Sequence, residues 1–428
     1  MTDDSSPSAH ADGPSTNPLS RRELLSGAAG LIGGAALAAL PRSLDAQQTA
    51  PIRAVAPIGA ARISGAPTAP LGARAAFETP VRAPVGEITG VSLTPLQSLT
   101  GNTTPADLHF ERHHAGIPTL DPDRHTLTIH GLVDRPLTFT VAELRRFPQV
   151  VRTHFLECSG NGRSAFREPK PELTPQQVAG MLSTTEWTGV PLATLFREAG
   201  VKASAKWFLA EGGDACLLTR SVPIAKAWDD ALVVWAQNGE PLRPAQGYPM
   251  RLLLPGWEGN TNVKWLRRLE LGTQPWMTRW ETSKYTDPLP NGTARIFSFE
   301  LDAKSVITSP AHPDVIVARG WRPVHGLAWS GRGRIVRVEV STDGGARWRD
   351  ADLLGPALPK CTVRFQHMWQ WTGGESLLLS RATDETGYVQ PTRRALIAAR
   401  GIGTDYHFNP LVGWNVQADG RVFFHGAT

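Results

Sequence analysis

The last third of the chain consists of short alternating segments separated by tight turns, and this pattern constrains the fold more than any other feature. From Arg334 to Ser341 apolar residues recur as in a half-buried strand, residues 343–345 (Asp-Gly-Gly) supply a hairpin turn, and the next strand carries Trp348. Such strands recur over about 120 residues. The sequence therefore predicts an immunoglobulin-like β-sandwich over residues 301–428 and excludes a helical bundle there.

Residues 86–300 show a mixed pattern of strands and short helices. Thr140 followed by Glu143 forms a capping box for a short helix through Arg146. At 428 residues the chain is long enough for two domains, so we expect an α+β architecture with a mixed α/β domain before the sandwich. Strands are expected at Leu127–His130, Val150–Glu157, Pro249–Leu254 and Val263–Leu271.

The first 46 residues are typical of a targeting signal. Arg21 and Arg22 precede a weakly apolar run from Ala28 to Leu40, which is the pattern of a twin-arginine export signal. An amphipathic or anchoring helix is the alternative, but the run is shorter than the roughly 20 residues that span a bilayer. We expect export to the periplasm, no membrane span in the mature chain, and a Pro/Ala-rich linker or arm over residues 47–85.

Composition excludes several classes of protein. The three cysteines, Cys158, Cys216 and Cys361, show neither CxxC nor CxxCH spacing, which excludes a zinc ribbon, covalent c-type haem and a disulfide framework. The formal charge of +5 is small for this length, and Lys and Arg are scattered without long runs. Nucleic-acid binding is therefore not expected.

Cys158 is the most informative single residue. It follows the predicted strand Val150–Glu157 and opens a loop with two glycines that ends at Arg163. Such a loop exposes a thiolate and leaves space beside the backbone. Three interpretations stay open: a metal ligand, the nucleophile of a Cys/His hydrolase, and an inert buried cysteine.

A histidine-rich segment, His109 to His114, precedes this strand. His113 and His114 are adjacent and would point to opposite faces of an extended segment, so one shared metal ion is disfavoured. A guanidinium matches a phosphate with two hydrogen bonds, and we interpret Arg112 with His114 as an anion or cofactor-phosphate site.

Several spaced motifs together resemble the sulfite oxidase family of molybdenum enzymes over roughly residues 90–420. They are Phe110 to His114, Cys158 to Arg163, Ser183 to Leu192, Gly247 to Arg251 with Val263 to Leu266, and Trp329 to Trp348. Three longer runs most resemble the molybdenum subunits of bacterial sulfane dehydrogenases: Gly256 to Asn260, Glu281 to Thr286 and Asp384 to Pro391.

The resemblance implies molybdenum in its dioxo form with one molybdopterin, and it implies roles for individual residues. Cys158 corresponds to the thiolate that binds the metal, and soft sulfur ligands suit such a site. Arg163, Tyr285 and Arg400 correspond to the lining of an oxyanion substrate pocket, although surface arginines and a core tyrosine are the plainer alternatives. The residues that correspond to cofactor-binding positions are Phe110, Arg112, His114, Cys158, Asp214, Arg251 and Lys264.

The chain also departs from the family pattern. Gly162 replaces an arginine of the animal enzymes, His113 replaces an asparagine, and Gln246 replaces a frequent histidine. An ungapped count places Gln177 where animal enzymes have a pocket tryptophan. These changes imply a less charged pocket, and we expect that free sulfite is not the preferred substrate.

Within the family, the implied activity is oxygen-atom transfer to sulfur. The chain is expected to be the catalytic subunit of a periplasmic sulfane dehydrogenase that oxidises carrier-bound sulfane sulfur in thiosulfate oxidation. With no haem motif in its sequence, it would pass electrons to a c-type cytochrome subunit. The family also implies a homodimer through the C-terminal domain. Alternatives are a dehydrogenase of free sulfite, a Cys-dependent hydrolase and a non-catalytic surface binder.

Overall fold

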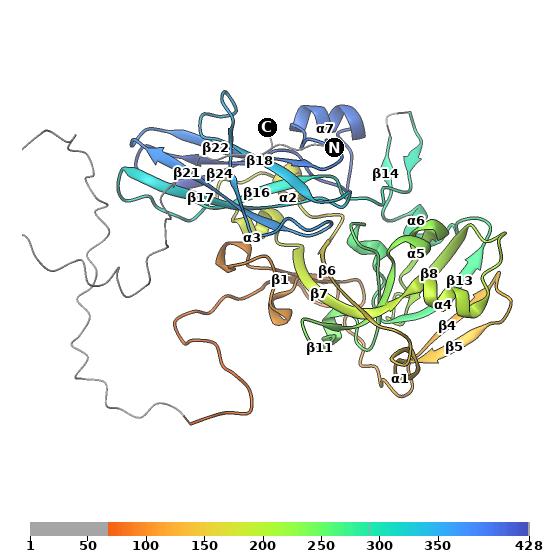
Figure 1. The fold of residues 1–428 in the computed structure, drawn as a ribbon. Coiled ribbons are helices and arrows are strands. Elements are labelled where there is room, and N and C mark those ends of the chain that lie inside the picture. Colours follow the sequence, from red (N-terminus) through yellow and green to blue (C-terminus); the bar gives the residue numbers. More distant parts are fainter. Residues whose placement is uncertain (1–66, 290, 427–428) are drawn as a thin grey trace, which may run out of the picture. The chain divides into compact units, whose positions relative to one another are not determined.

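The computed structural model describes residues 67–289 and 291–426, which belong to one compact unit (Figure 1). The expected signal at residues 1–46 and residues 47–66 of the expected arm lie outside the described residues. Residues 67–82 form no helix or strand and are largely exposed, and the first strand begins at Ala83, inside the range expected for the arm. Within the described part, no helix has the length and apolar character to cross a membrane.

A small antiparallel sheet in the order β1-β2-β3 comes first along the chain. Arg112 of β3 stands opposite Val91 of β2, so the histidine-rich segment is held extended along its neighbour. The elements are β1 (Ala83–Gly86), β2 (Gly90–Leu93), β3 (Glu111–His113) and the 3₁₀ turns η2 (Leu96–Ser98) and η3 (Ala106–Leu108).

Two five-stranded sheets form the mixed α/β part. One has the order β11-β10-β7-β6, with β12 also paired to β10, and the other has the order β5-β4-β13-β8-β9. All these pairs are antiparallel except β13 with β4. The strands are β4 (Thr126–Gly131), β5 (Leu137–Thr140), β6 (Val150–Glu157), β7 (Leu182–Pro191), β8 (Trp207–Gly212), β9 (Thr219–Pro223), β10 (Leu232–Gln237), β11 (Glu240–Pro241), β12 (Arg251–Leu253) and β13 (Leu266–Gly272). The helices are α1 (Val141–Leu144), α2 (Arg163–Arg167), α3 (Pro175–Ala179), α4 (Leu192–Ala199), α5 (Ile224–Asp229) and α6 (Arg279–Thr282), with 3₁₀ turns η4 (Pro244–Gln246) and η5 (Gly259–Thr261).

Local sequence signals explain several of these elements. The capping box of Thr140 and Glu143 forms as predicted, although α1 ends at Leu144. The strand predicted at Val150–Glu157 is confirmed. The strand predicted from Val263 begins only at Leu266, because Trp265 has a φ of +53°, a left-handed conformation that a regular strand cannot include.

The C-terminal part is a two-layered β-sandwich, which confirms the predicted immunoglobulin-like type. Its sheets have the orders β16-β17-β21-β20 and β19-β18-β22-β23-β24. Their inner faces share a core that includes Trp329 and Trp414. The elements are β16 (Lys304–Ser309), β17 (Gly320–Trp329), β18 (Ile335–Ser341), β19 (Arg349–Asp350), β20 (Asp352–Leu354), β21 (Val363–Trp371), β22 (Ser376–Asp384), β23 (Gly413–Val416), β24 (Val422–His425) and helix α7 (Arg393–Arg400). Before it lies a short hairpin, β14 (Asp287–Pro288) with β15 (Ala294–Arg295).

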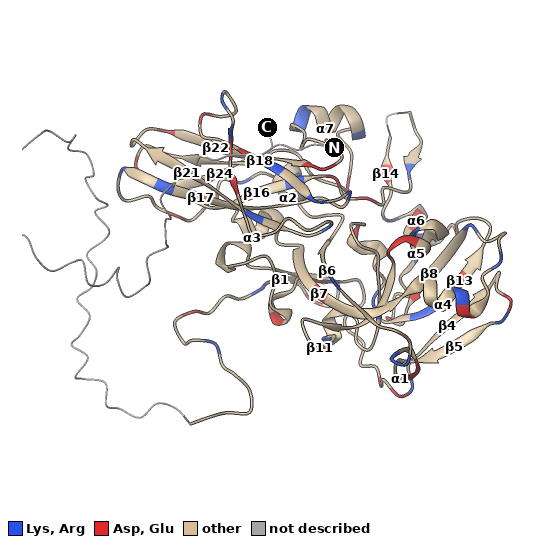
Figure 2. Ribbon diagram, viewed as in Figure 1, with Lys and Arg blue, Asp and Glu red and all other residues tan. Residues whose placement is uncertain are grey.

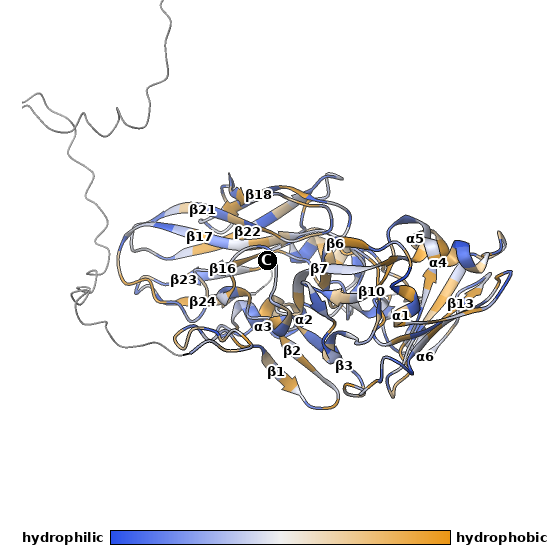
Figure 3. Cartoon of the chain, turned by 60° about the horizontal axis from the view of Figure 1, so that its bottom comes forward, coloured by the Kyte–Doolittle hydropathy of each residue, from blue (hydrophilic) through white to orange (hydrophobic). Residues whose placement is uncertain are grey.

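Side-chain chemistry follows this architecture. In Figure 3 apolar and polar residues alternate along the sandwich strands, and in β21 Val363, Phe365, Trp369 and Trp371 are the buried members. Figure 2 shows acidic and basic residues dispersed along the ribbon, with no continuous basic stretch. The electrostatic effects described below therefore come from individual charged residues and not from one large charged surface.

Candidate functional site

The strand β6 delivers Cys158 into a tight turn. The backbone N–H of Cys158 donates to the Met181 carbonyl at 3.0 Å, and its carbonyl accepts from Asn161 at 2.9 Å. Gly259 of η5 passes directly beside this turn, since a Cβ atom there would lie 2.7 Å from the Glu157 carbonyl oxygen and 3.2 Å from Cys158 Cα. Cys158 is thus held between two chain segments that approach closely only because residue 259 is glycine.

Glu157, the residue before Cys158, anchors the turn to the sandwich. Its buried carboxylate accepts from Lys304 Nζ and from Asn161 Nδ2, both at 2.9 Å, and from Trp329 Nε1 at 2.6 Å. Lys304 also donates to the Asn161 carbonyl at 3.0 Å. Sequence reasoning missed this cluster, because no spacing rule joins a strand end to residues more than a hundred positions away.

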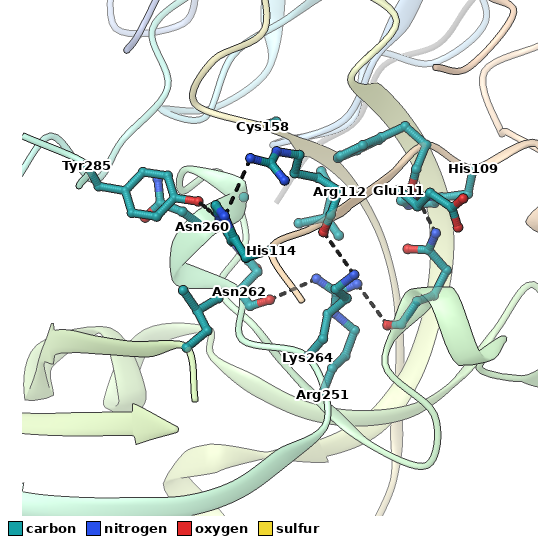
Figure 4. A pocket seen from close by; sticks show the side chains of 15 residues that line it. His109, Glu111, Arg112, His114, Cys158, Arg251, Asn260, Asn262, Lys264 and Tyr285 are labelled. Carbon is teal, nitrogen blue, oxygen red and sulfur yellow. Dashed lines mark hydrogen bonds between the residues drawn. The ribbon is translucent and has the colours of Figure 1, made fainter. Parts of the chain in front are cut away.

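A pocket opens beside Cys158 and brings together five separate stretches of the chain (Figure 4). Seven of the predicted site residues line it, namely Phe110, Arg112, His114, Cys158, Arg251, Lys264 and Tyr285. The other lining residues are His109, Glu111, Leu156, Leu218, Gln246, Gly259, Asn260 and Asn262. None of these eight was predicted as a site residue from the sequence, and Leu218 and Asn262 lie outside every motif named above.

His114 and Tyr285 point toward each other in this pocket (Figure 4), with His114 Nε2 2.6 Å from the Tyr285 hydroxyl oxygen. Burial and, second, the charge of the neighbouring Arg112 guanidinium lower the pKa of His114 to about 4, so the ring is neutral near pH 7. Arg112, which can only donate, lies 3.5 Å from His114 Nδ1. The ring proton is therefore assigned to Nε2, and Tyr285 keeps its own hydroxyl proton to donate elsewhere.

The ammonium group of Lys264 has three hydrogen-bond partners within the protein. Its Nζ lies 2.9 Å from the Ala245 carbonyl, 3.1 Å from the Arg112 carbonyl and 2.8 Å from His113 Nδ1. Burial lowers its pKa well below the ordinary value, and the charge of Arg251 adds to this. Lys264 thus fixes the backbone of the histidine-rich segment at the pocket wall.

Arg251 forms another wall and has hydrogen-bonding capacity left. It donates to the Gln246 carbonyl at 3.0 Å and to the Asn262 carbonyl at 2.9 Å, while its buried Nε has no partner among the described residues. Burial lowers the pKa of Arg251 to about 9. The guanidinium lies over the Trp187 ring, 5.4 Å from its centroid.

Three predicted site residues lie outside the lining of this pocket. Asp214 accepts from the Leu218 backbone N–H at 3.1 Å and from the Cys216 thiol at 2.9 Å, so it shapes the loop that brings Leu218 to the pocket. Arg163 donates to the Asp405 carbonyl at 2.6 Å and lies 5.3 Å from the centroid of the Tyr406 ring.

Arg400, the third, lines a separate cavity, where it donates to Ser298 Oγ at 3.3 Å. The face of α7 that includes Leu396, Ala399 and Arg400 lines that cavity, so the helix places Arg400 there. Gln177 caps α3 at Thr174 and likewise lies outside the pocket lining. The roles proposed from sequence for Asp214, Arg163 and Arg400 stay predictions.

The environment of Cys158 argues against an activated hydrolytic nucleophile. Burial raises the pKa of its thiol, and a hydrogen bond from the Gly160 backbone and the charge of Arg112 oppose this in part. A nucleophilic cysteine needs a lowered pKa or an adjacent base. A bound metal ion deprotonates a thiol outright, so the site suits a metal ligand better.

The pocket also offers hydrogen-bonding groups that suit a cofactor with polar rings. Alongside the sulfur of Cys158 it offers buried atoms without a partner in the described structure: Arg251 Nε, His109 Nε2 and Asn260 Oδ1. Burial lowers the pKa of His109 to about 3, so this ring is neutral; its Nδ1 donates to the Phe110 carbonyl at 2.8 Å and Nε2 is left to accept. Unpaired buried groups of both kinds fit a cofactor with donor and acceptor edges.

Comparisons with known proteins agree with this geometry. Residues 114–280 match the oxidoreductase molybdopterin binding domain, and residues 295–413 match the Mo-co oxidoreductase dimerisation domain. The chain shares 44% sequence identity with a chain in the crystal structure of the sulfane dehydrogenase SoxCD from Paracoccus pantotrophus. That match has a TM-score of 0.83 and covers 87% of this chain and 97% of the other.

Enzymes of other organisms are similar over a smaller share. Sulfite oxidase of Gallus gallus is 33% identical over 67% of this chain and 68% of its own length. An NADH nitrate reductase of Solanum lycopersicum is 33% identical over 68% of this chain. The chain spans 36% of that nitrate reductase and 58% of the Mus musculus sulfite oxidase, so these relatives extend well beyond the shared part.

Proposed function

This chain belongs to the sulfite oxidase family and is a molybdopterin-dependent oxidoreductase, and from that premise we propose that it is the catalytic subunit of a sulfane dehydrogenase. The observation that carries the proposal is the 44% identity to a sulfane dehydrogenase over 97% of that chain, against 33% identity to a sulfite oxidase over 68% of its length. The substrate would be a sulfane sulfur bound to a carrier protein.

Molybdenum with one molybdopterin would supply the redox chemistry when bound, accepting two electrons in each oxygen-atom transfer to sulfur. Each transfer joins one oxygen atom, ultimately from water, to the sulfur and releases two protons and two electrons. In this chain Cys158 would hold the metal, and the walls formed by Arg112, His114 and Arg251 would hold the pterin. The unpaired Nε of Arg251 is the donor best placed for this.

Tyr285 would act on the substrate side of the pocket. Burial raises the pKa of its phenol, so the hydroxyl keeps its proton near neutral pH. Since the neutral His114 ring donates to the Tyr285 oxygen, the tyrosine hydroxyl would be free to donate a hydrogen bond to the oxygen that becomes joined to the sulfur. Arg163 would contribute positive charge from behind Tyr406, whose hydroxyl accepts from the Tyr285 backbone at 3.2 Å.

The state of the pocket arginines supports a carrier-bound sulfur over free sulfite. The two arginines that line the pocket, Arg112 and Arg251, donate part of their guanidinium forks to backbone carbonyls, and Arg163 lies outside the lining. A small dianion is held best by a whole guanidinium fork, and neither Arg112 nor Arg251 presents one, although Arg251 keeps its unpaired Nε. Gln246 is equally occupied, since its amide donates to the Phe110 carbonyl at 2.8 Å.

The wider setting is part of the same proposal. The twin-arginine pattern supports a periplasmic location, and the sequence has no haem motif, which supports a separate c-type cytochrome as electron acceptor in thiosulfate oxidation. The dimerisation-domain match supports a dimer.

Dehydrogenation of free sulfite is the second candidate, and the sulfite oxidases among the relatives favour it. Steady-state assays of the molybdenum-loaded enzyme with cytochrome c as acceptor separate the two. We expect kcat/KM for a sulfur-carrier protein loaded with sulfane sulfur to exceed that for free sulfite by at least about a hundredfold. Equal or faster oxidation of free sulfite would overturn the sulfane assignment and leave the family assignment intact.

A further inference from the structure

A second cavity, of about 600 Å³, lies apart from the Cys158 pocket. Its walls come from the connector before the sandwich, from α7 and from Trp257. Neither Cys158 nor Tyr285 lines it. The volume is in the range of cavities that hold small organic ligands.

Two arginines on the cavity wall are poorly neutralised. Arg295 donates to the Ala399 carbonyl at 3.3 Å, and its Nη1 is buried without a hydrogen-bond partner in the described structure. In that part of the chain, Arg295 has no carboxylate within 4.0 Å. Arg400 has only Asp287, at 4.0 Å.

These two guanidiniums also repel each other. Burial lowers the pKa of Arg400, and the charge of Arg295 is the next largest cause. The charges of Glu258, Asp302 and Asp287 oppose this only in part. Asp302 is already bound by Arg332 at 2.6 Å and by His407 at 2.7 Å, and Glu300 forms no ion pair with either arginine in the described structure. An anion between Arg295 and Arg400 would satisfy the free N–H and remove the repulsion.

The opposite part of the lining is aromatic. Trp257 and Phe299 stack with ring centroids 4.3 Å apart and an interplanar angle of 13°. Phe297 extends this surface, with its centroid 5.1 Å from that of Phe299. Phe299 lies between Trp257 and Phe297 in this stack, and all three rings are only partly buried, so their edges are what a ligand can contact.

We propose that this cavity binds an organic oxyanion, with its acid group between Arg295 and Arg400 and its flat apolar part against the ring edges of Trp257 and Phe299. The site is distinct from the Cys158 pocket and goes beyond the proposed oxidation of sulfur. Inorganic sulfate shares the head group and lacks the apolar part, and it therefore serves as the reference ligand.

Calorimetric titration of the molybdenum-loaded enzyme tests this, with benzenesulfonate and sulfate as probes. Benzenesulfonate is expected to bind at least about tenfold more tightly than sulfate. Arg295→Gln should weaken benzenesulfonate binding by at least about tenfold, whereas Arg152→Gln, at an exposed arginine outside the cavity, should leave it unchanged.

A second pair of variants tests the location of the binding site by adding a bulky side chain instead of removing a charge. Ala395 of α7 is exposed and lines the cavity, while Ala398 on the same helix is exposed and does not. Ala395→Trp should abolish binding and Ala398→Trp should preserve it, with the molybdenum content of both unchanged. Absence of saturable binding up to about 10 mM, equal affinity for sulfate, or binding that survives both Arg295→Gln and Ala395→Trp would overturn the proposal. Each of these outcomes is independent of which sulfur substrate the enzyme oxidises.

Discussion

The ammonium of Lys304 lies 2.9 Å from the carboxylate of Glu157, and this buried pair ties the turn that carries Cys158 to the first strand of the sandwich. Glu157 also accepts from Trp329, and Lys304 also donates to the Asn161 carbonyl. A buried ion pair of this kind is stable only because its remaining hydrogen-bonding positions are filled.

Removing one partner should therefore be much worse than removing both. Lys304→Met leaves Glu157 buried and unpaired, and we expect a loss of about 3–5 kcal/mol in the free energy of unfolding. The double variant Glu157→Gln/Lys304→Met should recover part of this loss, and Lys202→Met, at an exposed lysine, should match the wild type. Urea unfolding measures all four proteins. A Lys304→Met protein as stable as the Lys202→Met control would show that the pair does not hold the turn.

Gly259 should tolerate no side chain. Since a Cβ atom there would lie 2.7 Å from the Glu157 carbonyl oxygen, Gly259→Ala must displace the turn that carries Cys158. We expect a cost of about 1–3 kcal/mol in stability and a lower molybdenum content. Gly374→Ala is the matched control, because a Cβ atom there meets nothing within 4 Å. Equal molybdenum contents in the two variants would contradict the close-approach argument.

Tyr285→Phe removes the hydroxyl proton and leaves the ring packing. We expect kcat to fall by about a hundredfold, with molybdenum content unchanged, because removing one hydrogen-bond donor to developing negative charge typically costs about that factor. The comparison needs kcat and metal content measured on the same preparation. A variant that keeps full kcat would remove Tyr285 from the reaction.

The ionisation of His114 should not affect the pH dependence of kcat. Burial lowers its pKa to about 4, so the ring stays neutral between about pH 5.5 and 8. The profiles of kcat for wild type and His114→Gln should therefore have the same shape over that range, even if their heights differ. Loss of an ionisation near pH 6.5 in the variant would contradict the assigned neutral state.

Glu258 should make stability depend on pH. Burial raises the pKa of this carboxyl from 4.5 to about 7, and hydrogen bonding to Asn260 and the charge of Arg220 oppose the rise. Between these two values the folded protein holds more protons than the unfolded chain, so stability falls as the pH rises. Relative to Glu258→Gln, the wild type should lose about 1–3 kcal/mol from about pH 4.5 to 7. Parallel stability curves for the two proteins would show that Glu258 has an ordinary pKa.

Local sequence signals predicted much of the fold. The strand Val150–Glu157, the capping box of Thr140 and the sandwich all depend on neighbouring residues, and the structure confirms them. Positions that depend on backbone geometry were harder: the left-handed conformation of Trp265 shortens a predicted strand and has no signature in the sequence.

Long-range packing explains what the sequence could not place at the site. Seven of the residues predicted from the order of the motifs line one pocket. Arg163 does not, because it is held by the Asp405 carbonyl, 242 positions away. Arg400 is directed to another cavity by helix α7. The Glu157–Lys304 pair joins residues 147 positions apart, and neither residue type is unusual on its own.

The most direct test of the central claim is the molybdenum and pterin content of natively produced wild type and Cys158→Ser. The account predicts about one molybdenum per chain in the wild type and loss of the metal in the variant, because the thiolate is its protein ligand. A Cys158→Ser protein that keeps both its molybdenum and its oxygen-transfer activity would contradict the assignment of this pocket.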